Sequence, residues 1–188
     1  DQAGLFRRLV KGCARDQGWQ ATFMSKPFVA QSGSGMHIHL SLLDQDGRNV
    51  FDDGGDQGSD QLRQAIAGAL ATYMEAQAAY AWTPHAYRRF LPDEFVPVSR
   101  SWGYENRSAA IRVPFAGGQG RRIEFRVPGA DANPHLALAC LLASVDHGLE
   151  QRLTPPQVSK GNACGVKDPG LPWSLRDALK SMESASIL

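Results

Sequence analysis

The sequence predicts an α+β fold, and two features of its patterning lead to this prediction. Stretches with helical spacing of apolar residues and stretches with period-two alternation both occur, but they do not alternate as regularly as in a parallel βαβ fold. Apolar residues make up 43% of the 188 residues and charged residues 21%, the composition of a globular domain. The net charge of +1 predicts no bulk attraction to nucleic acid or to an anionic membrane.

The first half of the chain predicts two helices and two strands. The helices are expected at residues 5–18 and 61–81, and the strands at residues 20–28 and 36–42. Pro27 interrupts the first strand, because proline cannot donate a ladder hydrogen bond. Asp60 is the expected N-cap of the longer helix, since a carboxylate there accepts from the free backbone N–H groups of the first turn.

The second half predicts a hairpin and two further helices. The expected elements are an ordered functional loop at residues 82–108, a β-hairpin of residues 109–114 and 121–128, a helix at residues 133–149, an irregular stretch at residues 154–173, and a short helix from residue 174 that the chain end cuts off. Asn133 followed by Pro134 predicts the start of the long helix, because asparagine caps and proline favours the first turn.

Two histidines on the second predicted strand are the first candidates for chemistry. His37 and His39 are two residues apart, so their side chains share one face of a strand. This spacing suits a metal site, while ordinary structural or surface histidines are the alternative. A zinc hydrolase built on the pair is a weak hypothesis, because no third ligand follows at a motif spacing.

The arginines are concentrated in one stretch. Eight of the 15 arginines lie within residues 88–126, where only four acidic residues occur. Guanidinium groups bind carboxylate and phosphate through two parallel hydrogen bonds, so the stretch favours recognition of a small polyanion such as a nucleoside triphosphate. A solvated charged surface is the alternative.

A carboxylate between two arginines helps to decide between a polyanion site and a solvated charged surface. Arg122, Glu124 and Arg126 are expected on one face of a strand. Two flanking cations would keep Glu124 ionised, so that it could coordinate Mg²⁺ while arginines hold phosphate oxygens. A cross-strand ion network without a ligand is the alternative.

Six segments together resemble the C-terminal catalytic segment of the glutamine synthetase family, over nearly the whole chain. They are Lys26-Pro27, residues 33–39 (GSGMHIH), residues 87–89 (YRR) with Pro92, residues 106–112 (NRSAAIR), residues 121–126 (RRIEFR) and Asn133-Pro134. The resemblance implies a curved antiparallel sheet backed by helices. It also implies ATP-dependent ligation of glutamate to an amine through γ-glutamyl phosphate, with Mg²⁺ or Mn²⁺ as cofactor.

The resemblance also implies a role for each matching residue. His37 and Glu124 correspond to metal ligands. The positions that match nucleotide or phosphate contacts are His39, Ser41, Arg107, Arg112 and Arg122. Those that match substrate contacts are Gly33, Arg89 and Arg126, and Arg89 and Arg107 are the expected catalytic arginines.

One position departs from the ammonia-using members of that family. Phe95 stands where those members have a glutamate that binds ammonium, with Glu94 next to it. An apolar wall suits the methylene chain of a larger amine, so the sequence predicts a glutamate–putrescine or polyamine ligase. The alternatives are a conventional ammonia-using glutamine synthetase, with Glu94 in the ammonium role, and a non-catalytic structural relative.

The resemblance covers only part of a typical family member. The N-terminal β-grasp domain and the C-terminal end are expected outside residues 1–188, so we expect the isolated chain to be inactive. A double-ring homo-oligomer is expected for the full-length protein. The three cysteines form no CxxC pair, which predicts reduced thiols in a cytoplasmic protein.

Overall fold

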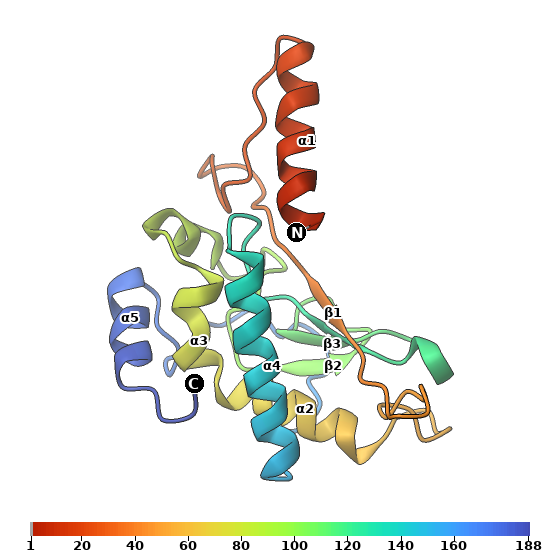
Figure 1. The fold of residues 1–188 in the computed structure, drawn as a ribbon. Helices are drawn as coiled ribbons and strands as arrows, with labels where there is room; N and C mark the ends of the chain where they lie inside the picture. Colours follow the sequence, from red (N-terminus) through yellow and green to blue (C-terminus); the bar gives the residue numbers. More distant parts are fainter. Residues whose placement is uncertain (1) are drawn as a thin grey trace.

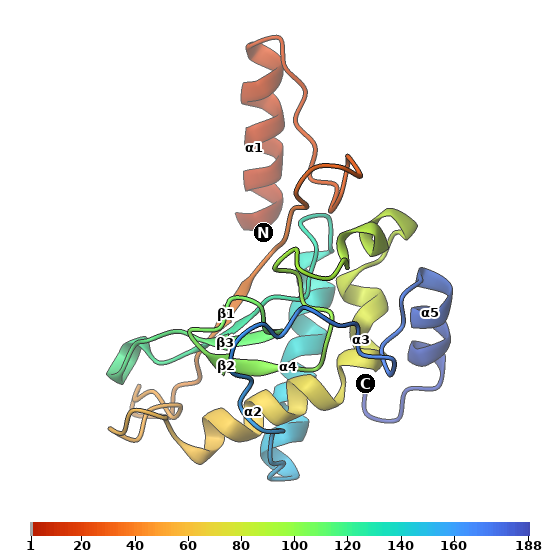
Figure 2. The same cartoon turned by 180° about the vertical axis from the view of Figure 1, so that it is seen from behind.

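A small sheet and the helices on one of its faces form the centre of the molecule (Figures 1 and 2). The structure is a computed structural model, and it describes residues 2–188. The sheet order is β1-β4-β3-β2, with strands Ile38–Leu40 (β1), Trp102–Tyr104 (β2), Ile111–Val113 (β3) and Ile123–Phe125 (β4). Helices combined with this sheet confirm the α+β class. Within residues 2–188, no helix is long and apolar enough to cross a bilayer.

The sheet is mixed, so the expectation of a wholly antiparallel sheet is wrong. β4 runs antiparallel to both β1 and β3, which confirms the predicted hairpin. β2 runs parallel to β3. The reason lies in the loop that joins them: the chain turns back at Glu105, in the left-handed region at φ 52°, and returns before β3 begins. The sequence analysis treated residues 82–108 as a loop and therefore missed β2.

The strand expected at residues 20–28 does not form. This segment is irregular in the structure, because no neighbouring strand lies beside it and Pro27 has no N–H to donate. Two of its polar residues, Ser25 and Lys26, are nevertheless fully buried. It follows α1 (Gln2–Asp16), which projects from the rest of the molecule in Figure 1 and has no buried residue.

The long predicted helix is broken into α2 (Asp60–Ala71) and α3 (Tyr73–Tyr80). The Thr72 hydroxyl lies 2.6 Å from the Ser144 hydroxyl of another helix and 3.1 Å from the carbonyl of Gly68, so both acceptors compete for its single proton where the first helix ends. Ser59, rather than Asp60, is the N-cap, since its hydroxyl accepts from the N–H of Leu62.

The last two helices begin where the sequence places them. Asn133 caps α4 (Pro134–Glu150) by accepting from two backbone N–H groups, and Ser174 caps α5 (Leu175–Glu183). The chain end does not cut off α5, contrary to the expectation. The helix ends at Glu183, and the following N–H groups of Ser186 and Ile187 donate to the carboxylate of Glu75.

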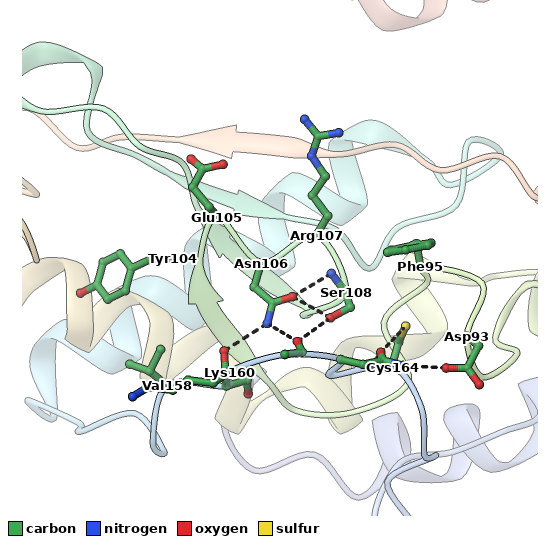
Figure 3. A pocket seen from close by; sticks show the side chains of 13 residues that line it. Asp93, Phe95, Tyr104, Glu105, Asn106, Arg107, Ser108, Val158, Lys160 and Cys164 are labelled. Carbon is green, nitrogen blue, oxygen red and sulfur yellow. Dashed lines mark hydrogen bonds between the residues drawn. The ribbon is translucent and has the colours of Figure 1, made fainter.

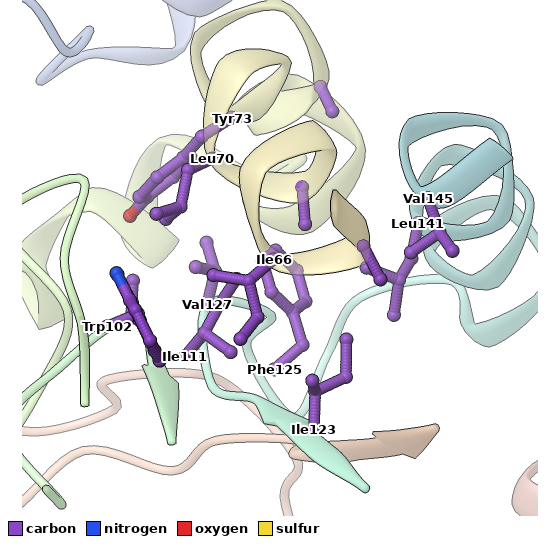
Figure 4. Packing of buried hydrophobic residues seen from close by; sticks show 14 of the residues in the cluster. Ile66, Leu70, Tyr73, Trp102, Ile111, Ile123, Phe125, Val127, Leu141 and Val145 are labelled. Atoms are coloured by element: carbon purple, nitrogen blue, oxygen red, sulfur yellow. The ribbon is translucent and has the colours of Figure 1, made fainter. Parts of the chain in front are cut away.

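The hydrophobic core lies between the sheet and helices α2 and α4 (Figure 4). Ile111 and Phe125 from the sheet pack among Ile66, Leu70 and other apolar side chains of the helices. The helices approach closely at Gly68, where an added Cβ would overlap the carbonyl oxygen of Ser144 and lie 2.8 Å from the backbone of Gly148, both in α4. This core fixes one face of the sheet, so the polar side chains of the same strands face the other way.

Candidate active site

The polar face of the sheet carries the candidate site. The register aligns His39 of β1 with Glu124 of β4, and Glu124 with Arg112 of β3. These three residues therefore form one cross-strand row, opposite the row of apolar side chains that enters the core. The alternation that sequence analysis recognised in residues 36–42 and 121–126 is what separates the two rows.

Glu124 is the centre of this face. Its side chain is only 2% exposed, and its two oxygens accept from different arginines. Arg126 Nη1 donates to Oε1 at 2.6 Å, and Arg112 donates to Oε2. Burial raises the pKa of Glu124, but the hydrogen bonds from Arg112 and Arg126 outweigh it, so the net pKa lies below the usual range. Glu124 is therefore ionised at neutral pH.

His37 completes the cluster from the start of β1. Its Nδ1 lies 3.0 Å from Glu124 Oε1 and 3.4 Å from Arg126 Nη1, and its side chain is 39% exposed. Burial lowers the pKa of His37, and the positive charge of Arg126 lowers it further, against the opposing effect of Glu124. The imidazole is therefore neutral at pH 7, the form that ligates metals.

His37 and Glu124 fit two positions around a divalent cation. Neighbouring ligands of an octahedral ion with bonds of about 2.1 Å lie about 3 Å apart, the separation found between these two donors. Oε1 of Glu124 also has a second acceptor position besides its hydrogen bond from Arg126. Within residues 2–188, the structure shows no group of three or more His, Cys, Asp or Glu side chains that could hold a metal ion.

The predicted nucleotide contacts His39, Ser41 and Arg122 lie near one another, where the end of β1 pairs with the start of β4. Arg122 Nε donates to His39 Nδ1 at 3.0 Å, and burial is the main cause that lowers the pKa of His39. The Nδ1 atom is thus the acceptor of a neutral ring. Ser41, just after β1, is exposed to solvent.

The predicted substrate arginine Arg89 has a different environment. It is buried, and its guanidinium donates to the backbone carbonyls of Val127 and Arg126 at 2.7 and 3.1 Å. Burial lowers the pKa of Arg89 to about 10, so the group still carries its charge. Gly33 lies against it: a Cβ there would be 3.1 Å from Arg89 Cγ and 2.9 Å from the Ser25 carbonyl. The close approach of the loop therefore requires glycine at this position.

A large open cavity lies beside Arg107 (Figure 3). It measures about 820 Å³ and is bounded by residues 93–95, 104–108 and 158–164; we call it the Phe95 cavity. Arg107 is exposed and forms no ion pair with any residue that the structure describes. Its guanidinium is therefore available to an anionic ligand.

The loop that carries Phe95 connects the Phe95 cavity to the sheet. Phe95 is 67% exposed and has φ 53°, and its carbonyl accepts from Arg126 Nη2 at 3.4 Å. The neighbouring Glu94 turns the other way and forms an ion pair of 2.6 Å with Lys26. The ion pair of Lys26 with Glu94 was not predicted. The sequence signals at this residue are its place in the Lys26-Pro27 segment and its isolation as the one lysine between residues 12 and 159.

The structure thus divides the predicted site residues into three groups. The cluster at β1 and β4 unites His37, His39, Arg112, Arg122, Glu124 and Arg126. Arg107 and Phe95 lie at the Phe95 cavity, whereas the buried Arg89 and the exposed Glu94 each have partners of their own.

Comparisons with known proteins identify the family of this chain. The family model of the glutamine synthetase catalytic domain matches residues 1–188. γ-Glutamylputrescine synthetase PuuA of Escherichia coli (strain K12) is 39% identical over 178 residues, covering 95% of this chain and 37% of that protein. γ-Glutamylethanolamide synthetase GlnA4 of Streptomyces coelicolor is 40% identical over 187 residues, covering 100% of this chain and 40% of that protein.

A glutamine synthetase and a solved structure also match this chain. A glutamine synthetase of Thermococcus kodakarensis is 40% identical over 191 residues, covering 97% of this chain and 43% of that protein. The solved structure of GmaS without ligand superposes with a TM-score of 0.86 at 31% identity, covering 97% of this chain and 43% of that one. The chain spans about two-fifths of the length of these relatives. With the family model matching throughout and the fold reproduced, this chain belongs to the glutamine synthetase family, within its catalytic domain.

Proposed function

We propose that this chain supplies part of the active site of an ATP-dependent ligase that joins the γ-carboxylate of glutamate to an amine. The observation that carries the proposal is the cluster of His37, Glu124, Arg112 and Arg126 on an open sheet face beside the Phe95 cavity. The named relatives support the reaction class, since they make γ-glutamylputrescine, γ-glutamylethanolamide or glutamine, all of them γ-glutamyl amides.

The proposed reaction has two steps. In the first, an oxygen of the γ-carboxylate attacks the γ-phosphorus of ATP, the bond to the β–γ bridging oxygen breaks, and ADP leaves. In the second, the amine nitrogen attacks the carbonyl carbon of γ-glutamyl phosphate, the bond from that carbon to the phosphate oxygen breaks, and the nitrogen gives up a proton. Phosphoryl transfer of this kind depends chiefly on positioning and on neutralising charge.

The arginines of the cluster provide that neutralisation. In this proposal Arg112 and Arg122 of the cluster, together with Arg107 at the Phe95 cavity, bind phosphate oxygens through their guanidinium groups. A divalent ion held by His37 and Glu124 would supply additional charge neutralisation on the phosphates. The pairing of Glu124 with Arg112 and Arg126 holds its carboxylate in one orientation before any ligand arrives.

The amine of this proposal is organic rather than ammonium. Phe95 presents an exposed ring to the Phe95 cavity, which favours a methylene chain. Glu94, the other candidate for an ammonium counter-charge, already has Lys26 as its partner. The apolar ring and the occupied carboxylate both argue against the ammonia-using alternative.

The test is the amine dependence of glutamate-dependent ADP formation by the intact protein that carries this chain. We expect clear turnover with 1,4-diaminobutane or n-butylamine and weak turnover with ammonium. A preference for ammonium would support the conventional glutamine synthetase instead. No turnover with any amine would support the structural relative.

The proposal concerns the whole assembly rather than residues 1–188 alone. The further metal ligands and the β-grasp domain would come from other parts of the protein, in a cytoplasmic double-ring homo-oligomer. We expect the isolated chain to bind nucleotide weakly and not to turn over. Substantial ligation by purified residues 1–188 would contradict this part of the proposal.

A further inference from the structure

The Phe95 cavity has a wall that is built before any ligand binds. The backbone N–H of Asp93 donates to the carbonyl of Cys164 at 3.0 Å, and Asn162 Nδ2 donates to Asp93 Oδ1 at 2.7 Å. On the opposite side, Asn106 Nδ2 donates to the carbonyls of Ser159 and Gly161. These contacts, drawn in part in Figure 3, tie three separate segments of the chain around one space.

Backbone strain is concentrated in the same wall. Four non-glycine residues of the described chain have positive φ, and three of them line the cavity: Asp93 at 62°, Phe95 at 53° and Glu105 at 52°. Such conformations cost free energy and persist only where surrounding contacts hold them, which is common at ligand sites.

The charges of the cavity are separated along its length. In Figure 3, Asp93 and Phe95 lie toward one end, whereas Tyr104, Val158 and Lys160 lie toward the other. Asp93 forms no ion pair with any residue that the structure describes, and its hydrogen-bond partner Asn162 is neutral. One carboxylate oxygen beside an exposed aromatic ring is thus left to a ligand.

The other acid of the cavity is already neutralised. Glu105 pairs with Arg112 Nη1 at 3.0 Å and also accepts from the backbone N–H of Phe115. In Figure 3, Phe95 is drawn between Arg107 and Asp93. A ligand that extends from Arg107 past Phe95 would therefore meet the carboxylate of Asp93 at its far end.

We propose that the Phe95 cavity binds the tail of the acceptor amine, and that Asp93 selects substrates whose tail ends in a second cationic amine. The inference rests on the proposed ligase function and names the substrate class of that site: an alkyl diamine or polyamine. Its methylene groups lie against Phe95, and its distal ammonium donates to the carboxylate of Asp93. A charged hydrogen bond of this kind discriminates against a neutral tail by about tenfold or more.

The experiment compares three amines of equal chain length with the intact protein. 1,4-Diaminobutane has a cationic tail, 4-amino-1-butanol a neutral polar tail, and n-butylamine an apolar tail. We expect kcat/KM for the diamine to exceed that for the other two by about tenfold or more. Asp93→Asn is expected to abolish this preference, mainly through a higher KM for the diamine.

Asparagine is chosen because it keeps the fold of the loop. It retains the oxygen that accepts from Asn162, and it tolerates positive φ. The matched control is Asp46→Asn, which removes an exposed carboxylate that does not line the cavity and should leave the preference intact. Equal thermal stability of the two variants will show that a changed preference does not come from misfolding.

The outcomes of this experiment distinguish a failure of the role of Asp93 from a failure of the proposed ligase function. Turnover with all three amines but no preference for the diamine, or a preference that survives in Asp93→Asn, would overturn the role of Asp93 alone. Absence of turnover with all three amines and with ammonium would overturn the ligase function, and this inference with it.

Discussion

Replacing Glu94 with glutamine should destabilise the protein more than replacing its partner Lys26 with methionine. The two side chains form an ion pair of 2.6 Å, but only 1% of the Lys26 side chain is exposed, against 38% for Glu94. Glu94→Gln leaves a buried ammonium without its counter-charge, which costs about 3–5 kcal/mol. Because glutamine still offers an oxygen acceptor, we expect the lower end of this range, about 3 kcal/mol.

Replacing Lys26 should reduce the stability of the protein less than replacing Glu94. Lys26→Met fills a similar volume with apolar atoms, and the remaining Glu94 carboxylate reaches solvent, so we expect a loss of about 1 kcal/mol. The double variant should be about as stable as Lys26→Met, since no unpaired buried charge remains. Urea unfolding followed by tryptophan fluorescence measures all three, with Asp46→Asn as an exposed control that should change stability by less than about 0.5 kcal/mol.

A Glu94→Gln variant as stable as Lys26→Met, or more stable, would refute this reasoning. The same variant also distinguishes two roles for the carboxylate. Unchanged stability together with lost ammonium-dependent turnover would place Glu94 in the ammonium role after all.

Two further predictions concern the core and the metal ligands. Gly68→Ala should cost about 1–3 kcal/mol in urea unfolding, because its Cβ meets the backbone of α4; Gly12→Ala, with no atom within 4 Å, should stabilise the protein by about 0.5–1 kcal/mol, and equal effects would contradict the close helix crossing. The affinity for Mn²⁺ should be constant above the pKa of His37, which lies below 6.5, and fall as the pH drops through it and the imidazole takes up a proton. Glu124 stays ionised in that window, since its pKa is below the usual range, so titration calorimetry from pH 5 to 8 should show the fall in wild type and no such step in His37→Gln. A decline that begins above pH 7 would contradict it.

The cluster around Glu124 could be predicted from the sequence, because it depends on the alternation of polar and apolar residues along single strands. His39 and Glu124 occupy alternating positions of their strands, so the polar row and the apolar row follow from the period of two. The predicted hairpin then brings Arg112 opposite Glu124. The only step that the pattern leaves open is which strand pairs with β1.

The errors arise where contacts distant in the sequence decide the structure. The helix break at Thr72 depends on Ser144, and the burial of Lys26 depends on Glu94. The parallel direction of β2 depends on the turn at Glu105, a residue that rarely adopts positive φ. None of these contacts has a periodic signal, so neither composition nor spacing predicts them.

The wall of the Phe95 cavity has a consequence for how such enzymes diversify. Asp93, Phe95 and Lys160 belong to irregular segments and are exposed, so exchanging them removes no packing from the core. The row that contains Glu124, by contrast, is part of the sheet itself. If these exposed residues choose the acceptor, as we propose, that choice can change without altering the row that contains Glu124. A few point mutations in the wall would let one duplicated gene adopt a new amine while its ancestor's chemistry is preserved.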